Sequence, residues 1–208
     1  MTDLHGQRMR FEKGHLYHVF NRSIAAKKVF INHENYIFFL WKIRNQLFDH
    51  CCIIAYCLMP THFHLMIYVI DPELQVINSD DPTKYKTRTI NQSIGILLRS
   101  YTSALQKQEQ FSGSLFQQHT KAICLTKPVG LTPAWFNTAF GTTINILPAQ
   151  KQYPQVCFDY IHNNPVNSNL VAKPHEFEYS SARDYAGLRQ GTLVNKRIAE
   201  NFGLNYSL

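Results

Sequence analysis

The sequence predicts an α+β domain in which helices cover one face of an antiparallel sheet. Segments with strand-like and helix-like hydrophobic patterns follow one another in the order strand, helix, strand, strand, helix, strand. The chain has 208 residues, of which 45% are hydrophobic, so it can bury a core without disulfides or a structural metal. This composition excludes a disordered chain, and no repeat indicates a collagen-like or coiled-coil protein. We expect one domain spanning residues 1–208.

The first strand and the first helix are predicted from local pattern. Residues 16–20 are rich in β-branched and aromatic residues and end at the polar run Asn21-Arg22-Ser23, as a strand does. Asn32 can cap the helix that follows. Its apolar positions recur every three or four residues, at Tyr36, Phe39, Leu40, Ile43 and Leu47.

A strand hairpin is predicted next. Residues 52–59 form a continuous apolar run, Pro60-Thr61 breaks it, and residues 62–70 form the second strand. Residues 71–87 contain two prolines, several acidic residues and no hydrophobic period, which predicts a loop.

The second half of the chain begins with another amphipathic helix. It runs from Thr89 to about Gln110, and a strand follows at residues 121–125. Residues 127–150 predict an inserted loop, rich in Pro, Thr, Gly and Asn. From about residue 152 we expect a helical extension, with a helix at 153–162 that ends at Asn163-Asn164-Pro165 and a short helix at 180–188. The complete order is that of a ferredoxin-like βαββαβ fold.

Charge and composition favour a nucleic-acid partner without proving one. Twenty-one Lys and Arg residues against fourteen Asp and Glu residues give a formal charge of +7 and a pI of about 9.2. The longest apolar run is far too short to cross a membrane, and no secretory signal is visible. Five cysteines without a CxxC pair indicate reduced core thiols. We therefore expect a cytoplasmic protein that has no membrane partner.

The sharpest local motif is His62-Phe63-His64 on the second strand of the hairpin. Residues two apart on a strand point to the same face about 6.6 Å apart, so both imidazoles could bind one divalent cation. With ten histidines in 208 residues, roughly half a His-x-His motif is expected by chance. An incidental pair on a half-exposed face therefore remains the alternative.

Such a metal site would need a nucleophile, and Tyr101 is one candidate. A tyrosine with a pKa near 10 attacks phosphorus only when the phosphate is activated and the developing charge is stabilised. Tyr101 lies on the apolar stripe of its helix, where an aromatic residue more commonly packs in the core. Ser100 and the cysteines are the other candidates.

Four blocks of sequence together resemble the single-tyrosine transposases of the HUH superfamily, and most of all the REP-associated tyrosine transposase branch. They are residues 17–22, residues 57–67, residues 100–102 with 113–117, and residues 160–166 with 179–181, which read YHVFNR, CLMPTHFHLMI, SYT with GSLFQ, and YIHNNPV with YSS. These blocks span most of the chain in the family's order.

The resemblance implies an endonuclease and strand transferase that acts on single-stranded DNA, usually at hairpins. Its tyrosine forms a 5′-phosphotyrosine and releases a 3′-hydroxyl, with Mg²⁺ or Mn²⁺ held by the two histidines. Carried over, His62 and His64 are metal ligands, and Tyr101 is the nucleophile that its helix delivers to the metal face.

The third ligand is where the sequence departs from this pattern. Family members commonly have Asn or Gln one turn after the tyrosine, but Leu105 stands there, and Gln106 is the nearest amide. Gln106 is rotated by about 140° from Tyr101 on an ideal helix, so a ligand role and an ordinary surface role stay open. The insertion at 127–150 is a second departure.

For DNA contact we expect phosphate partners among the basic residues Arg22, Lys84, Lys86, Arg88 and Arg99. Any one of them alone is more commonly a solvated charge. Two alternatives to the transposase remain: a non-catalytic single-stranded DNA-binding protein with a ferredoxin-like fold, and an HUH replication initiator or relaxase. A homodimer in which the tyrosine acts on the partner's histidines stays open as well.

Overall fold

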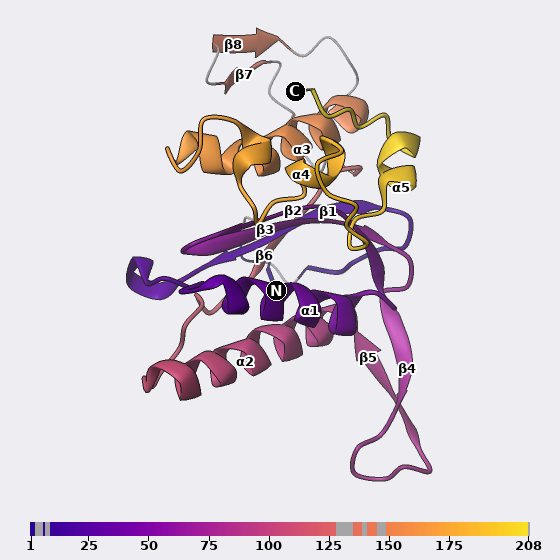
Figure 1. The fold of residues 1–208 in the computed structure, drawn as a ribbon. Coiled ribbons are helices and arrows are strands. Elements are labelled where there is room, and N and C mark those ends of the chain that lie inside the picture. Colours follow the sequence, from indigo (N-terminus) through magenta and orange to yellow (C-terminus); the bar gives the residue numbers. More distant parts are fainter. Residues whose placement is uncertain (3–5, 7–8, 128–134, 139–140, 145–148, 208) are drawn as a thin grey trace.

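A four-stranded antiparallel sheet forms the centre of the molecule (Figure 1). The computed structural model describes residues 1–2, 6, 9–127, 135–138, 141–144 and 149–207. The strands are β1 (Leu16–Arg22), β2 (Cys51–Met59), β3 (His62–Val69) and β6 (Lys121–Cys124), in the spatial order β2-β3-β1-β6. This order places the first and third strands at the centre, which confirms the ferredoxin-like arrangement and puts both histidines on a central strand.

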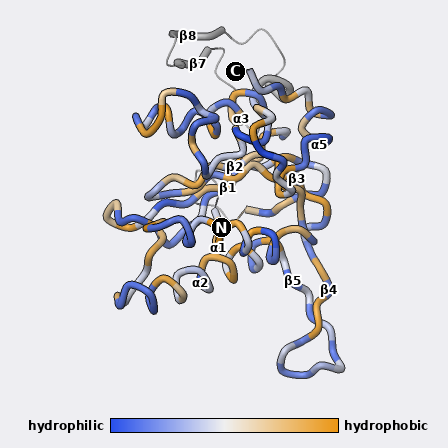
Figure 2. Tube along the Cα trace, in the orientation of Figure 1, coloured by the Kyte–Doolittle hydropathy of each residue, from blue (hydrophilic) through white to orange (hydrophobic). Residues whose placement is uncertain are grey.

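The two helices of the βαββαβ order cover one face of the sheet (Figure 1). They are α1 (His33–Leu47) and α2 (Ile90–Glu109). Asn32 caps α1, accepting a hydrogen bond from the backbone of Asn35, and Thr89 caps α2 in the same way. Hydrophobic and hydrophilic residues alternate along α2 (Figure 2), as its amphipathic pattern predicts.

The opposite face is covered by the C-terminal part of the chain (Figure 1). It contains α3 (Ala149–Asn167), α4 (Ala182–Tyr185), α5 (Lys196–Asn201) and the short 3₁₀ helix η2 (Pro174–Glu176); a second 3₁₀ turn, η1 (Ile24–Ala26), follows β1. The expected end of α3 at residues 163–165 is wrong, because the helix continues through Pro165. A proline removes only one backbone donor, and a helix that is packed against a sheet can tolerate that loss.

Residues 71–89, predicted mainly as a loop, instead form a two-stranded arm that projects from the body (Figure 1). Its strands are β4 (Glu73–Ile77) and β5 (Tyr85–Thr89), paired from Glu73–Thr89 to Ile77–Tyr85. Because the arm lies outside the core, neither strand contains a buried residue: β4 alternates only between exposed and partly buried positions, and β5 is mostly exposed.

Part of the predicted insertion at 127–150 also contains strands. β7 (Trp135–Thr138) and β8 (Gly141–Ile144) pair antiparallel, and α3 begins at Ala149. Much of the remaining insertion lies outside the described residues.

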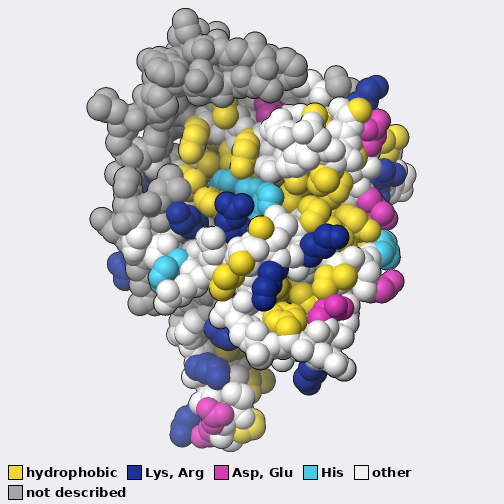
Figure 3. Space-filling view, turned by 90° about the vertical axis from the view of Figure 1, so that its left-hand side faces the viewer, with side chains coloured by type: hydrophobic (Ala, Val, Ile, Leu, Met, Phe, Trp, Pro, Cys, Tyr) yellow, Lys and Arg dark blue, Asp and Glu magenta, His cyan; other side chains and the backbone are white. Residues whose placement is uncertain are grey.

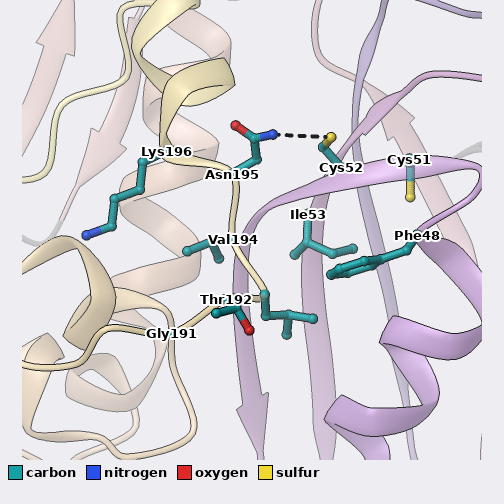
Figure 4. Close-up of a pocket in the computed structure, with 10 residues that line it drawn as sticks. Phe48, Cys51, Cys52, Ile53, Gly191, Thr192, Val194, Asn195 and Lys196 are labelled. Carbon is teal, nitrogen blue, oxygen red and sulfur yellow. Dashed lines mark hydrogen bonds between the residues drawn. The ribbon is translucent and has the colours of Figure 1, made fainter.

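Terminal segments cover both edges of the sheet. Thr2 pairs with Lys121 on β6, and Val194 pairs with Ile53 on β2. Figure 4 shows the segment 191–196 beside β2, where the amide of Asn195 donates to the Cys52 thiol across 3.5 Å. Edge strands that are covered in this way cannot recruit further strands. Among the described helices, none is both long and apolar enough to span a membrane.

Candidate active site

The strand β3 divides its side chains between the two faces of the sheet. Phe63 is buried in the core beneath α1 and α2, whereas His64 contacts Tyr160 of α3 on the opposite face. On that second face, His62 lies opposite Arg22 of β1 and His64 lies opposite Phe20. The pleat of the strand therefore places the two histidines on one face, as their spacing predicts, and that face is the one covered by α3.

The helix α3 brings a tyrosine and an amide to these histidines. The ring centroids of Tyr160 and His64 are 5.3 Å apart, and the Asn164 Oδ1 atom lies 3.4 Å from the His62 Nε2 atom. Residues four apart lie on the same side of a helix, so Tyr160 and Asn164 approach the sheet together. Tyr160 is 47% exposed, whereas Asn164 is buried.

Each histidine uses its Nδ1 atom for a contact within the protein. The His62 Nδ1 atom lies 3.0 Å from the Thr61 hydroxyl, and the His64 Nδ1 atom lies 2.9 Å from the His18 Nε2 atom. The His64 Nε2 atom is buried and has no hydrogen-bond partner. A buried nitrogen without a partner is a candidate ligand atom.

Burial disfavours the charged form of all three imidazoles. It lowers the pKa of His18 to about 3, and it lowers the pKa of His64 well below the usual range, with His18 and His62 adding to the effect. Burial also lowers the pKa of His62; its contact with Asn164 opposes this effect, and the Arg22 charge adds to it. Neutral imidazoles have the lone pair that a metal ion requires.

A pocket of about 450 Å³ opens beside these side chains. Its lining includes Phe20, Asn21, Arg22, His62, His64, Gln117, His119, Lys121 and Tyr160. The Asn21 amide donates to the Gln117 carbonyl and the Thr120 hydroxyl, which fixes the loop before β6 against β1. Figure 3 shows histidine side chains gathered near the centre of this face with Lys and Arg side chains beside them.

The donor set suits a divalent cation that keeps open coordination positions. His62 Nε2 and Asn164 Oδ1 face each other, and His64 Nε2 is buried without a partner. Amide oxygen suits Mg²⁺ and Mn²⁺, whereas imidazole nitrogen is more typical of Zn²⁺ and other first-row metals; a cation held by these three side chains would keep waters or phosphate oxygens in its remaining positions. In the described part of the chain, no group of three or more His, Cys, Asp or Glu side chains could hold a metal, so any site here would consist of two histidines and an amide.

Tyr101 does not reach the histidines, and the expectation that its helix delivers the hydroxyl to them needs correction. The side chain is 1% exposed and packs in the core on the α1 and α2 side of the sheet. Its hydroxyl donates to the Val29 carbonyl across 2.7 Å. The sheet itself separates Tyr101 from His64, so its position on the apolar stripe reflects core packing.

Gln106 is also absent from the histidine face. It lies near the end of α2, where its amide Nε2 donates to the Gly113 carbonyl across 2.8 Å. The structure therefore does not bring it to His62 or His64, because α2 lies on the other side of the sheet.

The five expected DNA contacts are distributed over separate parts of the molecule. Arg22 lines the pocket. Lys84, Lys86 and Arg88 belong to the β4–β5 arm, where Lys84 pairs with Asp81 at 2.8 Å and Lys86 donates to Ser79 at 3.2 Å. Arg99 is exposed on α2.

The site residues missed from the sequence are Tyr160, Asn164 and His18. The spacing of Tyr160 and Asn164 was a usable signal, because the amide stands one helical turn after the tyrosine, whereas Leu105 stands at that place after Tyr101. His18 had no comparable signal, since its contact with His64 depends on the pairing of β1 with β3.

Comparison with known proteins identifies the fold. The solved structure of a REP-associated tyrosine transposase bound to a REP hairpin is similar, with a TM-score of 0.56 and 15% sequence identity over 86% of this chain and 84% of that one. At this identity the likeness is one of fold. No protein-family model and no curated protein sequence matches the chain.

Proposed function

We propose that this chain is a metal-dependent endonuclease and transposase that cleaves and rejoins single-stranded DNA through Tyr160. The observation that carries the proposal is the meeting of Tyr160 and Asn164 with His62 and His64 beside one basic pocket. The similar fold of a tyrosine transposase supports the assignment. Tyr160 replaces Tyr101 as the proposed nucleophile, and Asn164 replaces Gln106 as the proposed third ligand.

In the proposed reaction, the Tyr160 oxygen attacks a backbone phosphorus atom. A bond forms between that oxygen and phosphorus, and the bond from phosphorus to the 3′-oxygen breaks. The phenol loses its proton as it attacks, and the leaving 3′-oxygen takes up a proton to become a hydroxyl. Attack of a 3′-hydroxyl on the phosphotyrosine reverses these changes and joins the strands without an external energy source.

His62, His64 and Asn164 would hold Mg²⁺ or Mn²⁺. The cation, when bound, would polarise the phosphate and stabilise charge on its oxygens. Arg22 and Lys121 line the same pocket and would bind phosphates on the strand. Because Tyr160 is partly exposed beside His64, a strand in the pocket could reach its hydroxyl.

We further propose that cleavage occurs in cis, on a hairpin-bearing strand. Tyr160 lies against His64 of its own chain, with ring centroids 5.3 Å apart, which supports action in cis. The similar solved structure is bound to a hairpin, which makes such a strand the appropriate first substrate.

The proposal can be tested with a hairpin-bearing oligonucleotide that carries different labels at its two ends. With Mn²⁺, the wild-type chain should form a covalent adduct that carries the 3′-end label, and the 5′-labelled fragment should be released with a free 3′-hydroxyl. Tyr160→Phe should abolish the adduct, and chelation or His64→Ala should reduce it by at least about 100-fold, as loss of a metal-dependent step requires.

Tyr85→Phe provides the matched control, because Tyr85 is an exposed tyrosine on the arm, away from the pocket. It should form the adduct at the wild-type rate. An adduct that persists in Tyr160→Phe would refute the assignment of the nucleophile. Salt-sensitive binding by a wild-type chain that forms no adduct would favour the non-catalytic binding protein instead.

A further inference from the structure

We propose that His18 is a positioning residue that holds His64 in the orientation and tautomer needed to bind a divalent cation. The inference rests on the proposed metal site and extends it to a residue outside the ligand set. It is carried by the contact between the His18 Nε2 and His64 Nδ1 atoms, which lie 2.9 Å apart.

The register of the sheet brings the two rings together. His64 lies opposite Phe20 on β1, and His18 lies two residues before Phe20, on the same face. Such diagonal neighbours are within reach of large side chains. The rings of His18 and His64 are nearly parallel and meet edge to edge, with centroids 5.1 Å apart and an interplanar angle of 26°. Their relative position therefore follows from strand pairing together with a specific hydrogen bond.

Of the two possible arrangements of this pair, one is compatible with metal binding by His64. Between two neutral imidazoles, one nitrogen must donate and the other must accept. If His18 donates, the proton of neutral His64 lies on Nε2, and that atom cannot bind a metal. If His64 donates from Nδ1, the His18 Nε2 atom accepts, and the buried His64 Nε2 atom presents its lone pair to the pocket.

Metal-binding histidines commonly donate their second N–H to a carboxylate, a backbone carbonyl or a water, which fixes the ring and increases its basicity. In the proposed arrangement the His18 Nε2 atom takes the place of that acceptor. His18 itself has little freedom to move. Only 6% of it is exposed, and its ring stacks on Phe20 and meets the Tyr160 ring with centroids 6.0 Å apart. His18 thus contacts both His64, a proposed metal ligand, and Tyr160, the proposed nucleophile.

Titration with Mn²⁺ alone, followed by electron paramagnetic resonance, tests this role without requiring cleavage. His18→Phe removes the acceptor and keeps a ring, so Mn²⁺ affinity should fall by about 10- to 100-fold. His18→Gln can return an acceptor oxygen near the position of Nε2, so its affinity should lie within about threefold of wild type. Met66→Leu, opposite His18 on β3, is the packing control and should bind as wild type does.

Nitrogen-15 shifts of the His64 ring in the metal-free protein provide a second measurement. They should report a proton on Nδ1 in wild type and in His18→Gln, and a mixture of tautomers in His18→Phe. Equal Mn²⁺ affinity in wild type and His18→Phe, or a proton on Nε2 of wild-type His64, would overturn the positioning role alone. A wild-type chain that binds no Mn²⁺ would instead overturn the proposed metal site on which the role rests.

Discussion

At the scale of single residues, Tyr101 and Tyr160 show how burial separates two side chains of the same chemistry. Tyr101 is enclosed on α2, where burial and the nearby Tyr36 raise the pKa of its hydroxyl above the usual range. Tyr160 on α3 is nearly half exposed and lies against His64. Of the two tyrosines, only Tyr160 is exposed enough for a DNA strand to reach it and has neighbours that could hold a cation.

Tyr101→Phe should affect stability but not chemistry. The substitution removes the hydrogen bond to Val29 and leaves that buried carbonyl without this donor, which should lower the free energy of unfolding by about 1 kcal/mol. Urea denaturation measures this change. The oligonucleotide assay should give a wild-type yield of adduct at a temperature where the variant is folded. Loss of the adduct from a folded Tyr101→Phe protein would restore Tyr101 as a candidate nucleophile.

At the scale of elements, the β4–β5 arm carries Lys84, Lys86 and Arg88, and it holds them away from the pocket. Its strands pair with each other and with no strand of the central sheet. Ile77 and Tyr85, a directly opposed pair near its end, are 60% and 70% exposed. The arm therefore adds surface to the molecule without belonging to its core.

Lys84→Ala combined with Lys86→Ala tests whether this surface contacts DNA. If each lysine neutralises one phosphate, the slope of log affinity against log salt should become shallower by about 1.4 to 1.8. The adduct yield at saturating DNA should not change, because Tyr160 and the histidines are untouched. Lys13→Ala with Lys173→Ala removes the same charge from exposed positions elsewhere. Identical slopes for the two double variants would show that the arm lysines are ordinary solvated charges.

At the scale of the whole molecule, the C-terminal part of the chain covers one face of the central sheet, and its segment 191–196 lies along the β2 edge. Asp184, whose side chain is 2% exposed, holds this segment through an ion pair with Arg189 at 2.6 Å and a hydrogen bond from the Gly191 backbone. Arg189 also donates to the Tyr56 hydroxyl on β2, across 2.6 Å. The ion pair between Asp184 and Arg189 thus links α4 to β2 and to the segment that begins at Gly191.

Arg189→Met should destabilise the fold by about 3 kcal/mol, because it leaves the buried Asp184 carboxylate without its charged partner. The free energy of unfolding from urea titration measures this loss. Lys84→Met is the control: it breaks the more exposed pair with Asp81 and should cost less than about 1 kcal/mol. Similar losses in the two variants would contradict the structural role of the buried pair.

Local pattern predicts much of this fold because helices and half-buried strands repeat with fixed periods. The caps and apolar stripes of α1 and α2, and the common face of His62 and His64, follow from sequence spacing alone. The β4–β5 arm escaped this approach, since its strands are short and contain no buried residue, so their hydrophobic pattern is weak. Local pattern also did not predict that α3 continues beyond Pro165, because packing of the helix against the sheet outweighed the loss of one backbone hydrogen bond.

By itself, the sequence determined that two imidazoles share one face of a central strand and that the chain contains tyrosines on helices. Tertiary structure decided which tyrosine meets them. The sheet has two faces, α2 crosses one and α3 the other, and no local pattern records on which face a helix will pack. The same holds for His18, whose contact with His64 arises only when β1 pairs with β3 in this register.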